Sequence, residues 1–350
     1  MQIHEPSSEL TFLSFNQTNN CLVAGTKHGY SLWRTNPFEH CASGFNDHKI
    51  FIVEMFYSTS LIAIVCDSVD RDHDRKILYL FNTKIEQVIC LLRFSEDIQA
   101  VRFNQQYLIV MLKTNIVIYT LEKIEAVCTL DIYFNRRGGI PTDVPANQTG
   151  RIALCPQRTL LAYPCDTTTG NIYLVTLRDV KSTEVVEGGD NYGSYKIIEA
   201  HDHPVAALAF TNDGSWLATA STRGTTIRIW DTHSRQQIME LKRSKIGKTA
   251  AVHSLSFSED GSMLVVSSTS KTIHIFAVMG ERKSEKSIAC IYLDDEGITE
   301  TYHISAFNAD SNVIQVAFAD GNYLHYRLPP PGASSRKCER CLEHSLLDRR

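Results

Sequence analysis

The side chains best suited to chemistry gather between His201 and Phe276. Histidine, serine, threonine and basic residues are unusually dense in this stretch. A basic side chain attracts an anion, and hydroxyl and imidazole groups supply hydrogen bonds to the remaining oxygens of that anion. The stretch therefore predicts an anion-binding site. The elements that carry these residues decide which of them face the same ligand.

Two similar units follow one another in this stretch. AALAFTNDGSWLATAS…IRIWDT, residues 206–232, is echoed by HSLSFSEDGSMLVVSS…IHIFAV, residues 253–278. A period in the forties, Asp-Gly turns between short alternating strands and the pair Trp230-Asp231 are typical of WD-type β-propellers. The length of 350 residues, divided by seven, gives 50 per unit. The predicted fold is therefore all-β, a seven-bladed WD-repeat β-propeller.

One domain accounts for the length, with the propeller predicted at residues 1–328. The first strand, or the few residues before it, is expected to pair with the last blade, because ring closure of that kind removes free sheet edges. Residues 329–350 are Pro-rich and then charged. They are predicted to form a flexible C-terminal tail.

Composition excludes several classes of function. The net charge of −4 predicts no general attraction to nucleic acid. No secretory leader and no long apolar run are recognised, so the ten cysteines read as reduced thiols of a cytoplasmic protein. Phosphate loops, nucleophile elbows and His-Glu-x-x-His are absent from the sequence, so no enzymatic activity and no cofactor are predicted. A Ser-His-Asp triad built from distant residues stays open.

Two segments offer metal ligands without a convincing pattern. The charged segment Asp67–Lys76 lacks the glycine and glutamate spacing of a calcium loop, so a solvated loop is favoured. Cys338 and Cys341, with His344, offer zinc ligands, but a second cysteine pair is missing. We therefore predict no metal site.

Nearly all of residues 8–328 resembles the PROPPIN/WIPI family of autophagy propellers. In the first four blades, the segments that resemble the family are LSFNQTNNCLVAGTKHGYSLWRTNPF, VEMFYSTSLIAIV, IQAVRFNQQYLIVML and LLAYPCDTTTGNIYLVTL. HDHPVAALAF, LATASTRGTTIRIWDT and VVSSTSKTIHIF resemble the stretches that line the two lipid pockets of the family. The chain looks closer to the human-type members three and four than to members one and two.

The resemblance implies a non-enzymatic effector that binds phosphatidylinositol 3-phosphate, with the 3,5-bisphosphate as a second candidate. It implies a peripheral location on preautophagosomal, phagophore or endosomal membranes during autophagosome formation. The family hallmark is Phe or Leu, two arginines and a glycine at the end of blade 5. The matching residues here are Leu241-Lys242-Arg243-Ser244. Lysine keeps the charge but loses the bidentate fork, so the first pocket should be weakened.

An Arg-Arg-Gly sequence also occurs at residues 136–138, in the linker between blades 3 and 4. The spacing from Arg228 and the blade 6 pattern that follows place the hallmark at residues 242–243 instead. The linker sequence is therefore interpreted as a solvated basic turn.

We predict two pockets. Successive side chains of a strand point to opposite faces, so Lys242 and Arg243 should reach different sides of the strand. The first predicted pocket comprises His201, Thr219, Ser221, Gly224, Thr225, Arg228 and Lys242. The second comprises Arg243, Ser267, Ser268, Thr272 and His274.

Each of these residues also has an ordinary structural interpretation. In WD repeats, residues at the positions of His201, Ser221 and Ser268 often form a hydrogen-bond network with the Trp-Asp aspartate. Thr225 and Thr272 start strands and are good β-formers. Single arginines are most often solvated.

The loop between the third and fourth strands of blade 6 departs from the family. At Met279–Ser287 it is short and charged, whereas the family loop is long and partly apolar. Deep insertion into a membrane is therefore not expected. Its basic residues are expected to attract anionic headgroups at the surface, partly offset by Glu281 and Glu285.

The resemblance also implies a protein partner, an Atg2-like autophagy lipid-transfer protein held by the rim of blades 1 to 3. Asn16 matches the partner-binding element of the family, whereas Thr18 replaces its aspartate. Phe15–Thr18 also reads as a simple tight turn between two strands. A monomer is expected. The alternative function is a WD-repeat protein–protein scaffold with weakened or lost lipid binding.

Overall fold

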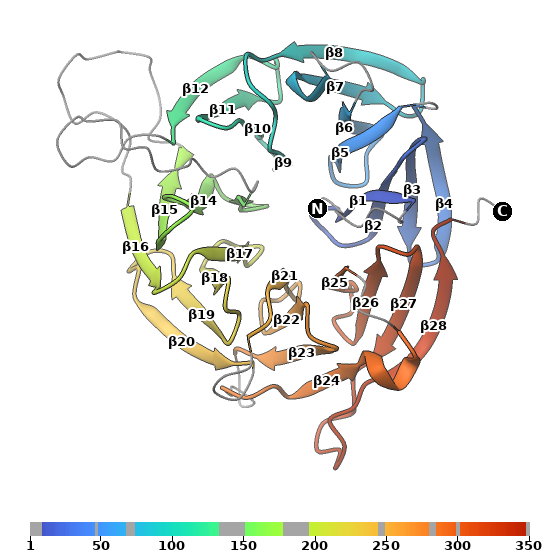
Figure 1. Ribbon diagram of the computed structural model, residues 1–350, viewed down its shortest axis with the longest axis vertical. Coiled ribbons are helices and arrows are strands. Elements are labelled where there is room, and N and C mark those ends of the chain that lie inside the picture. Colours follow the sequence, from blue (N-terminus) through green and yellow to red (C-terminus); the bar gives the residue numbers. More distant parts are fainter. Residues whose placement is uncertain are drawn as a thin grey trace.

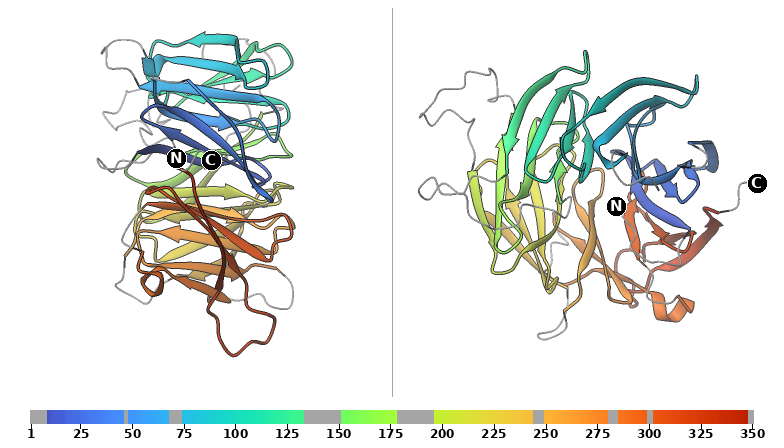
Figure 2. Two further views of the ribbon diagram at one scale, coloured as in Figure 1. Left: turned by 90° about the vertical axis from the view of Figure 1, so that its right-hand side faces the viewer. Right: turned by 45° about the horizontal axis from the view of Figure 1, so that its top comes forward.

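The computed structural model describes residues 9–45, 48–67, 74–132, 151–177, 196–243, 249–279, 285–298 and 302–347. Its strands form seven antiparallel four-stranded sheets arranged radially as the blades of a β-propeller (Figure 1 and Figure 2). This confirms the predicted fold. Each blade uses four consecutive strands, with the first near the central axis and the fourth on the outer rim (Figure 1).

The first three blades comprise β1 Leu10–Phe15, β2 Cys21–Thr26, β3 Gly29–Thr35, β4 Phe38–Gly44; β5 Lys49–Met55, β6 Leu61–Asp67, β7 Ile77–Asn82, β8 Gln87–Arg93; β9 Ala100–Phe103, β10 Tyr107–Met111, β11 Asn115–Thr120 and β12 Ala126–Asp131. Blades 4 and 5 comprise β13 Ala153–Leu154, β14 Leu160–Pro164, β15 Gly170–Thr176, β16 Lys196–His201; β17 Val205–Phe210, β18 Trp216–Ser221, β19 Thr226–Asp231 and β20 Gln237–Lys242. Blades 6 and 7 comprise β21 Val252–Phe257, β22 Met263–Ser268, β23 Thr272–Ala277, β24 Ala289–Tyr292; β25 His303–Phe307, β26 Val313–Phe318, β27 Asn322–Arg327 and β28 Glu339–Ser345.

The helical elements that lie wholly within these ranges are two short 3₁₀ turns, η1 Asp74–Lys76 and η3 Leu293–Glu296. No helix in the described part of the chain is long and apolar enough to span a bilayer.

The Asp-Gly turns of the sequence repeat have the same geometry in blades 5 and 6. Gly214 and Gly261 have φ of +68° and +72°, a left-handed conformation that glycine adopts without a steric penalty. The preceding aspartates, Asp213 and Asp260, each accept a hydrogen bond from the backbone N–H two residues later, at 3.0 Å. The turn residues therefore set the register of the first two strands in both blades.

Apolar side chains fill the space between neighbouring blades. Leu241 of blade 5 packs in one cluster with Val266 of blade 6, and both are fully buried. Ile198 of blade 4 packs with Trp230 of blade 5. Because side chains alternate along each strand, one face of a blade meets the preceding blade and the other face meets the following one.

The ring closes differently from the prediction. β1 pairs with β2, and the outer strand of blade 7 is β28, from the C-terminal end of the chain. The expectation that the first strand pairs with the last blade is therefore wrong, and residues 1–8 lie outside the described residues. Side-chain packing joins blades 1 and 7, with Leu10 and Leu346 in the same cluster. The two described ends thus meet at one junction, as predicted (Figure 1).

The predicted flexible tail is wrong for Glu339–Ser345, which forms β28 and pairs with β27 along its whole length. Most side chains of β28 are exposed, since an outer-rim strand contributes mainly backbone hydrogen bonds. Such a strand carries no apolar alternation, so no sequence pattern predicted it. The residues on either side of β28 anchor it, because Cys338 and Leu346 are buried, at 3% and 2% exposed.

Candidate functional site

The outer strand of blade 5, β20, ends at Lys242 and is followed directly by Arg243. The side chain of Lys242 is more than half exposed, whereas Arg243 is only 6% exposed. β20 pairs with β19 through Lys242 and Thr226, and the Arg243 N–H donates to the carbonyl of Thr225 at 3.0 Å. The two neighbouring cations thus occupy different environments, one exposed and one buried.

On the side facing blade 4, a hydrogen-bond network centres on Thr219. The hydroxyl of Thr219 lies 2.9 Å from Nε2 of His201 and accepts a hydrogen bond from the indole N–H of Trp230 at 3.0 Å. Thr219 is fully buried. Burial and the charge of Arg228 lower the pKa of His201 to about 4, so its imidazole is neutral at pH 7. His201 and Thr219 therefore form a structural bridge between blades 4 and 5.

In WD repeats such a network often includes the aspartate of the Trp-Asp pair. Here it includes Trp230, and Asp231 lies outside it. The carboxylate of Asp231 instead accepts hydrogen bonds from the backbone N–H and hydroxyl of Ser234, within the turn between β19 and β20. Both hydrogen bonds lower the pKa of Asp231. The aspartate thus stabilises a turn at the opposite end of the strands from Lys242.

Arg228, which faces blade 4, and Lys242 are each paired with a carboxylate. Nε of Arg228 lies 3.4 Å from Glu240, and its Nη1 donates to the carbonyl of Ala200 at 2.8 Å. Nζ of Lys242 lies 2.9 Å from Glu285. Any anion that binds these cations must compete with these two carboxylates. The prediction from sequence did not include Glu240. This residue lies on β20, directly opposite Arg228 on β19.

Gly224 was assigned to the first pocket, but its structural contacts are on the blade 6 side. A Cβ atom at Gly224 would lie 2.0 Å from the carbonyl oxygen of Ala250, and its φ is +59°. Its own carbonyl accepts a hydrogen bond from Nε of Arg243. Gly224 therefore belongs with Arg243 structurally, as does the carbonyl of Thr225. Ser221, by contrast, lies on the same face of β18 as Thr219.

On the side facing blade 6, Arg243 lies beside a cluster of hydroxyl groups. Its Nη1 donates to the hydroxyl of Ser270 at 3.2 Å, and Ser270 lies 2.8 Å from the hydroxyl of Ser268. Ser270 also donates to the carbonyl of Thr272 at 3.0 Å. Burial, with the nearby charge of Arg243, lowers the pKa of His274 to about 4. Arg243, Ser268, Thr272 and His274 are thus brought together as predicted. Ser270 was missed, although it lies between predicted residues in the sequence.

Ser267 does not join this cluster. Its hydroxyl lies 2.6 Å from that of Ser305 in blade 7, and Ser267 is fully buried. Successive residues of β22 face opposite sides, so Ser268 and Ser267 cannot both face blade 5. Ser267 is therefore a bridge between blades 6 and 7.

The predicted partner-binding residues lie in the turn between β1 and β2. Asn16 is 3% exposed, its side-chain oxygen accepts the Cys21 N–H at 3.0 Å, and its side-chain nitrogen donates to Asn20 at 2.7 Å. The exposed Thr18 donates to the same Asn20 oxygen at 2.9 Å. Asn16 therefore holds the turn, and Thr18 is the residue of the two that a partner can reach.

Several predicted features fall outside the described residues. These are Ser244, the Arg-Arg-Gly sequence at 136–138 and residues 280–284 of the blade 6 loop. For metals, the described ranges contain no group of three or more His, Cys, Asp or Glu side chains that could hold an ion. Cys338 is buried, Cys341 is exposed and the His344 ring stacks on Phe38 with centroids 4.1 Å apart.

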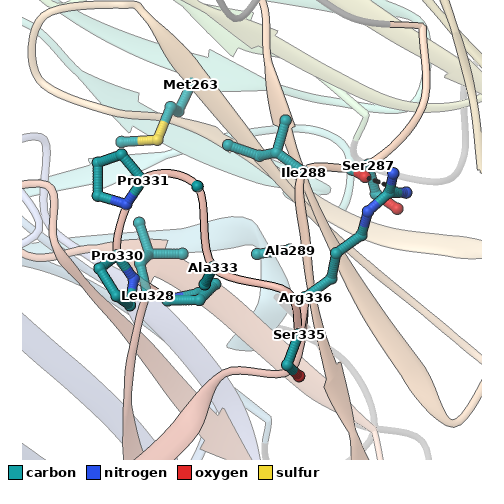
Figure 3. A pocket seen from close by; sticks show the side chains of 12 residues that line it. Met263, Ser287, Ile288, Ala289, Leu328, Pro330, Pro331, Ala333, Ser335 and Arg336 are labelled. Atoms are coloured by element: carbon teal, nitrogen blue, oxygen red, sulfur yellow. Dashed lines mark hydrogen bonds between the residues drawn. The ribbon is translucent and has the colours of Figure 1, made fainter.

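Two cavities among the described residues are lined by residues other than the predicted site residues. One of about 220 Å³ lies between blade 6 and the proline-rich segment Leu328–Ala333, where Nη1 of Arg336 donates to the carbonyl of Ser287 at 3.2 Å (Figure 3). The other, of about 590 Å³, is lined by loops of blades 3, 4 and 5.

Comparison with solved structures supports the fold. Hsv2 from Kluyvelomyces marxianus superposes with a TM-score of 0.77 at 17% identity, covering 98% of this chain and 100% of that one. A complex of KlAtg21 with the coiled coil of AgAtg16 matches with the same TM-score at 24% identity, covering 96% of this chain and 99% of that one.

Comparison with characterised sequences gives the family. Autophagy-related protein 18 from Dictyostelium discoideum is 34% identical over 77% of this chain and 65% of its own length. Human WD repeat domain phosphoinositide-interacting protein 1 is 31% identical over 89% of this chain, again 65% of its own length. The chain thus spans slightly less than two thirds of these relatives. The PROPPIN family model matches residues 9–325. Because this match covers most of the chain, the chain belongs to the PROPPIN family.

Proposed function

We propose that the chain binds phosphoinositide headgroups, with phosphatidylinositol 3-phosphate as the ligand, through residues on both sides of β20. The observation that carries the proposal is the position of Arg243. Its guanidinium is held by the carbonyl of Gly224 and the hydroxyl of Ser270, beside Ser268 and His274. A cation surrounded by hydroxyl and imidazole groups suits the oxygens of a phosphate monoester.

The names of the relatives agree with this ligand class. The human relative is named for phosphoinositide interaction, and the Dictyostelium relative for autophagy. We therefore propose that the chain is recruited as a peripheral scaffold to membranes where autophagosomes form. Lys242 and Arg228 would contribute a second, weaker headgroup site on the blade 4 side.

Flotation of the purified chain with liposomes tests the proposal. Liposomes of phosphatidylcholine with phosphatidylinositol 3-phosphate are compared with liposomes of phosphatidylcholine alone. We expect the chain to float only with the phosphoinositide, and Arg243→Ala to reduce the floated fraction. Flotation that is equal with and without the phosphoinositide would contradict the proposal.

A second candidate function is a protein–protein scaffold with weak lipid binding. The ion pairs of Lys242 with Glu285 and Arg228 with Glu240 favour it, because they occupy two of the cations proposed for the lipid. One similar structure is a propeller in complex with a coiled coil. The candidate partner remains an Atg2-like protein at the rim of blades 1 to 3.

A pull-down with Thr18→Ala tests that contact, because Thr18 is exposed in the blade 1 turn. We expect lower recovery of the partner. Unchanged recovery would remove Thr18 from the site. Asn16→Ala serves as the comparison for indirect loss through the turn.

A further inference from the structure

The larger cavity lies at the junction of blades 4 and 5, at the opposite end of the strands from the candidate lipid site. β16 runs from Lys196, which lines the cavity, to His201, which belongs to the Thr219 network. Five residue steps of a strand correspond to about 17 Å. Buried Ile198 and Ala200 lie between the two ends. The cavity is therefore separate from the headgroup residues.

The cavity carries positive charge from two blades. Arg158 comes from the loop between β13 and β14, Lys196 from the start of β16 and Arg235 from the turn between β19 and β20. None of its eleven lining residues is acidic. Within the described ranges, these three cations form no ion pair. Guanidinium and ammonium groups that share a concave site without a carboxylate raise the local potential for an anion.

Asp213 is an acidic residue that approaches Arg158. It interacts electrostatically with Arg158 but does not line the cavity. Its carboxylate already accepts hydrogen bonds from the Thr211 hydroxyl at 2.7 Å and the Ser215 N–H at 3.0 Å. These contacts hold Asp213 in its own turn, so Arg158 remains available to a ligand.

The loops that present the cations are fixed by hydrogen bonds. The side chain of Asn104 donates to the carbonyl of Arg158 at 3.2 Å, and Leu177 N–H donates to Thr159 O at 2.7 Å. In blade 5, the Thr232 hydroxyl donates to the carbonyl of Gly214 at 2.6 Å, and the Arg235 N–H donates to Asp231 O at 2.8 Å. A site built on fixed loops loses little conformational entropy when it binds.

The remaining lining decides which anion fits. Leu160 and Leu174 provide apolar surface, while Gln106 and Gln157 add side-chain amides that can pair with peptide groups. A volume of about 590 Å³ accommodates a short protruding segment. A flat bilayer meets the rim of a concave site but not its apolar interior. We infer that this cleft binds an acidic peptide segment of a partner protein, with carboxylates on Arg158, Lys196 and Arg235 and an apolar side chain against Leu160 and Leu174.

Fluorescence polarisation with the full chain tests this inference. The probe is a short fluorescein-labelled peptide in which aspartate alternates with leucine, and the matched peptide carries asparagine in place of aspartate. We expect the aspartate peptide to bind more tightly, with an affinity that falls as salt is added. Arg158→Glu with Arg235→Glu should weaken binding by at least about tenfold, because two charge-assisted contacts become repulsive.

The matched control is Arg34→Glu with Lys113→Glu, which makes the same change in net charge. These residues pair with Glu39 and Asp97 in blades 1 and 3, away from the cleft. Thermal unfolding of both double variants checks that the fold is retained. The inference is overturned if the two peptides bind wild type equally, or if the control double variant loses binding as much as the cleft variant.

A vesicle arm separates a peptide from a membrane. Phosphatidylcholine vesicles with phosphatidylserine are mixed with wild type and with the Arg158→Glu, Arg235→Glu variant. Equal vesicle binding by both, together with loss of peptide binding in the variant, supports a peptide cleft. Loss of vesicle binding in the variant, with no peptide binding by wild type, overturns it and identifies a membrane-facing surface.

Discussion

Lys242 and Glu285 interact through both their side chains and their backbones. The ammonium of Lys242 lies 2.9 Å from the carboxylate of Glu285, and the N–H of Lys242 donates to the carbonyl of Glu285 at 2.8 Å. The ion pair raises the pKa of Lys242 and lowers that of Glu285. The carboxylate thus stands where the proposed headgroup phosphate would bind, so the chain carries its own competitor at the weaker site.

Glu285→Gln should strengthen flotation with phosphatidylinositol 3-phosphate. The change removes the competing charge and frees the ammonium of Lys242. Both side chains are exposed, so we expect an increase of only a few-fold. Glu259→Gln, an exposed carboxylate in the turn between β21 and β22, is the matched control. If both variants bind alike, Glu285 does not compete with the lipid.

Arg243→Ala should reduce liposome binding more than Lys242→Ala. Arg243 keeps the guanidinium fork beside hydroxyl groups, whereas Lys242 is a point charge already paired with Glu285. Loss of one charge-assisted contact is expected to lower affinity about tenfold or more. The double variant should nearly abolish binding, because two sites on one rigid rim engage the same bilayer. Co-flotation and thermal unfolding are measured together.

Three further measurements constrain the same assignment. Lys242→Arg should strengthen binding by restoring the fork, and added salt should weaken every variant. Arg136→Ala with Arg137→Ala should have little effect on flotation. If this last pair eliminates binding while the Lys242 and Arg243 variants retain it, the family hallmark has been placed on the wrong residues.

Gly224→Ala should both destabilise the propeller and impair the Arg243 site. The new Cβ would meet the carbonyl of Ala250 at 2.0 Å, and the carbonyl of Gly224 that receives Arg243 would have to move. Gly297→Ala is the control, since Gly297 has φ of +68° but no atom within 4 Å of the added Cβ. Backbone strain alone should cost the control about 1–2 kcal/mol. Chemical denaturation should show a larger loss for Gly224→Ala.

Acid should destabilise the fold through His201. Burial and the nearby Arg228 charge lower the pKa of folded His201 to about 4, below the ordinary value of 6.5. As pH falls from about 6.5 towards 4, the unfolded chain binds a proton that the folded chain does not. Stability is therefore fully present above pH 6.5 and falls below it. At pH 5 the loss from this histidine is at most about 2 kcal/mol.

His201→Gln should remove the His201 share of this pH dependence, because the amide cannot gain the proton, while His274, whose pKa is also lowered to about 4, keeps its own share. Urea unfolding at pH 7.5 and pH 5 measures the difference in the free energy of unfolding. The exposed His233→Gln should leave the dependence unchanged. An unaltered pH dependence in His201→Gln would show that His201 does not contribute to it.

The sequence by itself determined the fold. The repeated Asp-Gly turns and alternating apolar residues predicted seven blades, because turn chemistry and side-chain period are local properties. The same alternation predicted opposite faces for Lys242 and Arg243. Family membership followed from motifs spread over residues 8–328.

Only the tertiary structure decided which predicted residues meet. The hydroxyl of Ser267 forms a hydrogen bond with that of Ser305 in the next blade. The carbonyl of Gly224 accepts a hydrogen bond from Arg243, not from Lys242. Glu285 reaches Lys242 across 43 residues of sequence. Contacts between blades depend on how two sheets pack, and no local pattern encodes them.

The same reasoning explains β28 and the basic cleft. β28 is held by backbone pairing at the outer rim, which leaves no apolar signature in Glu339–Ser345. Arg158, Lys196 and Arg235 come from separate loops, and each alone reads as an ordinary solvated cation. Their shared cleft exists because blades 4 and 5 pack face to face, with Ile198 and Trp230 in the buried core between them.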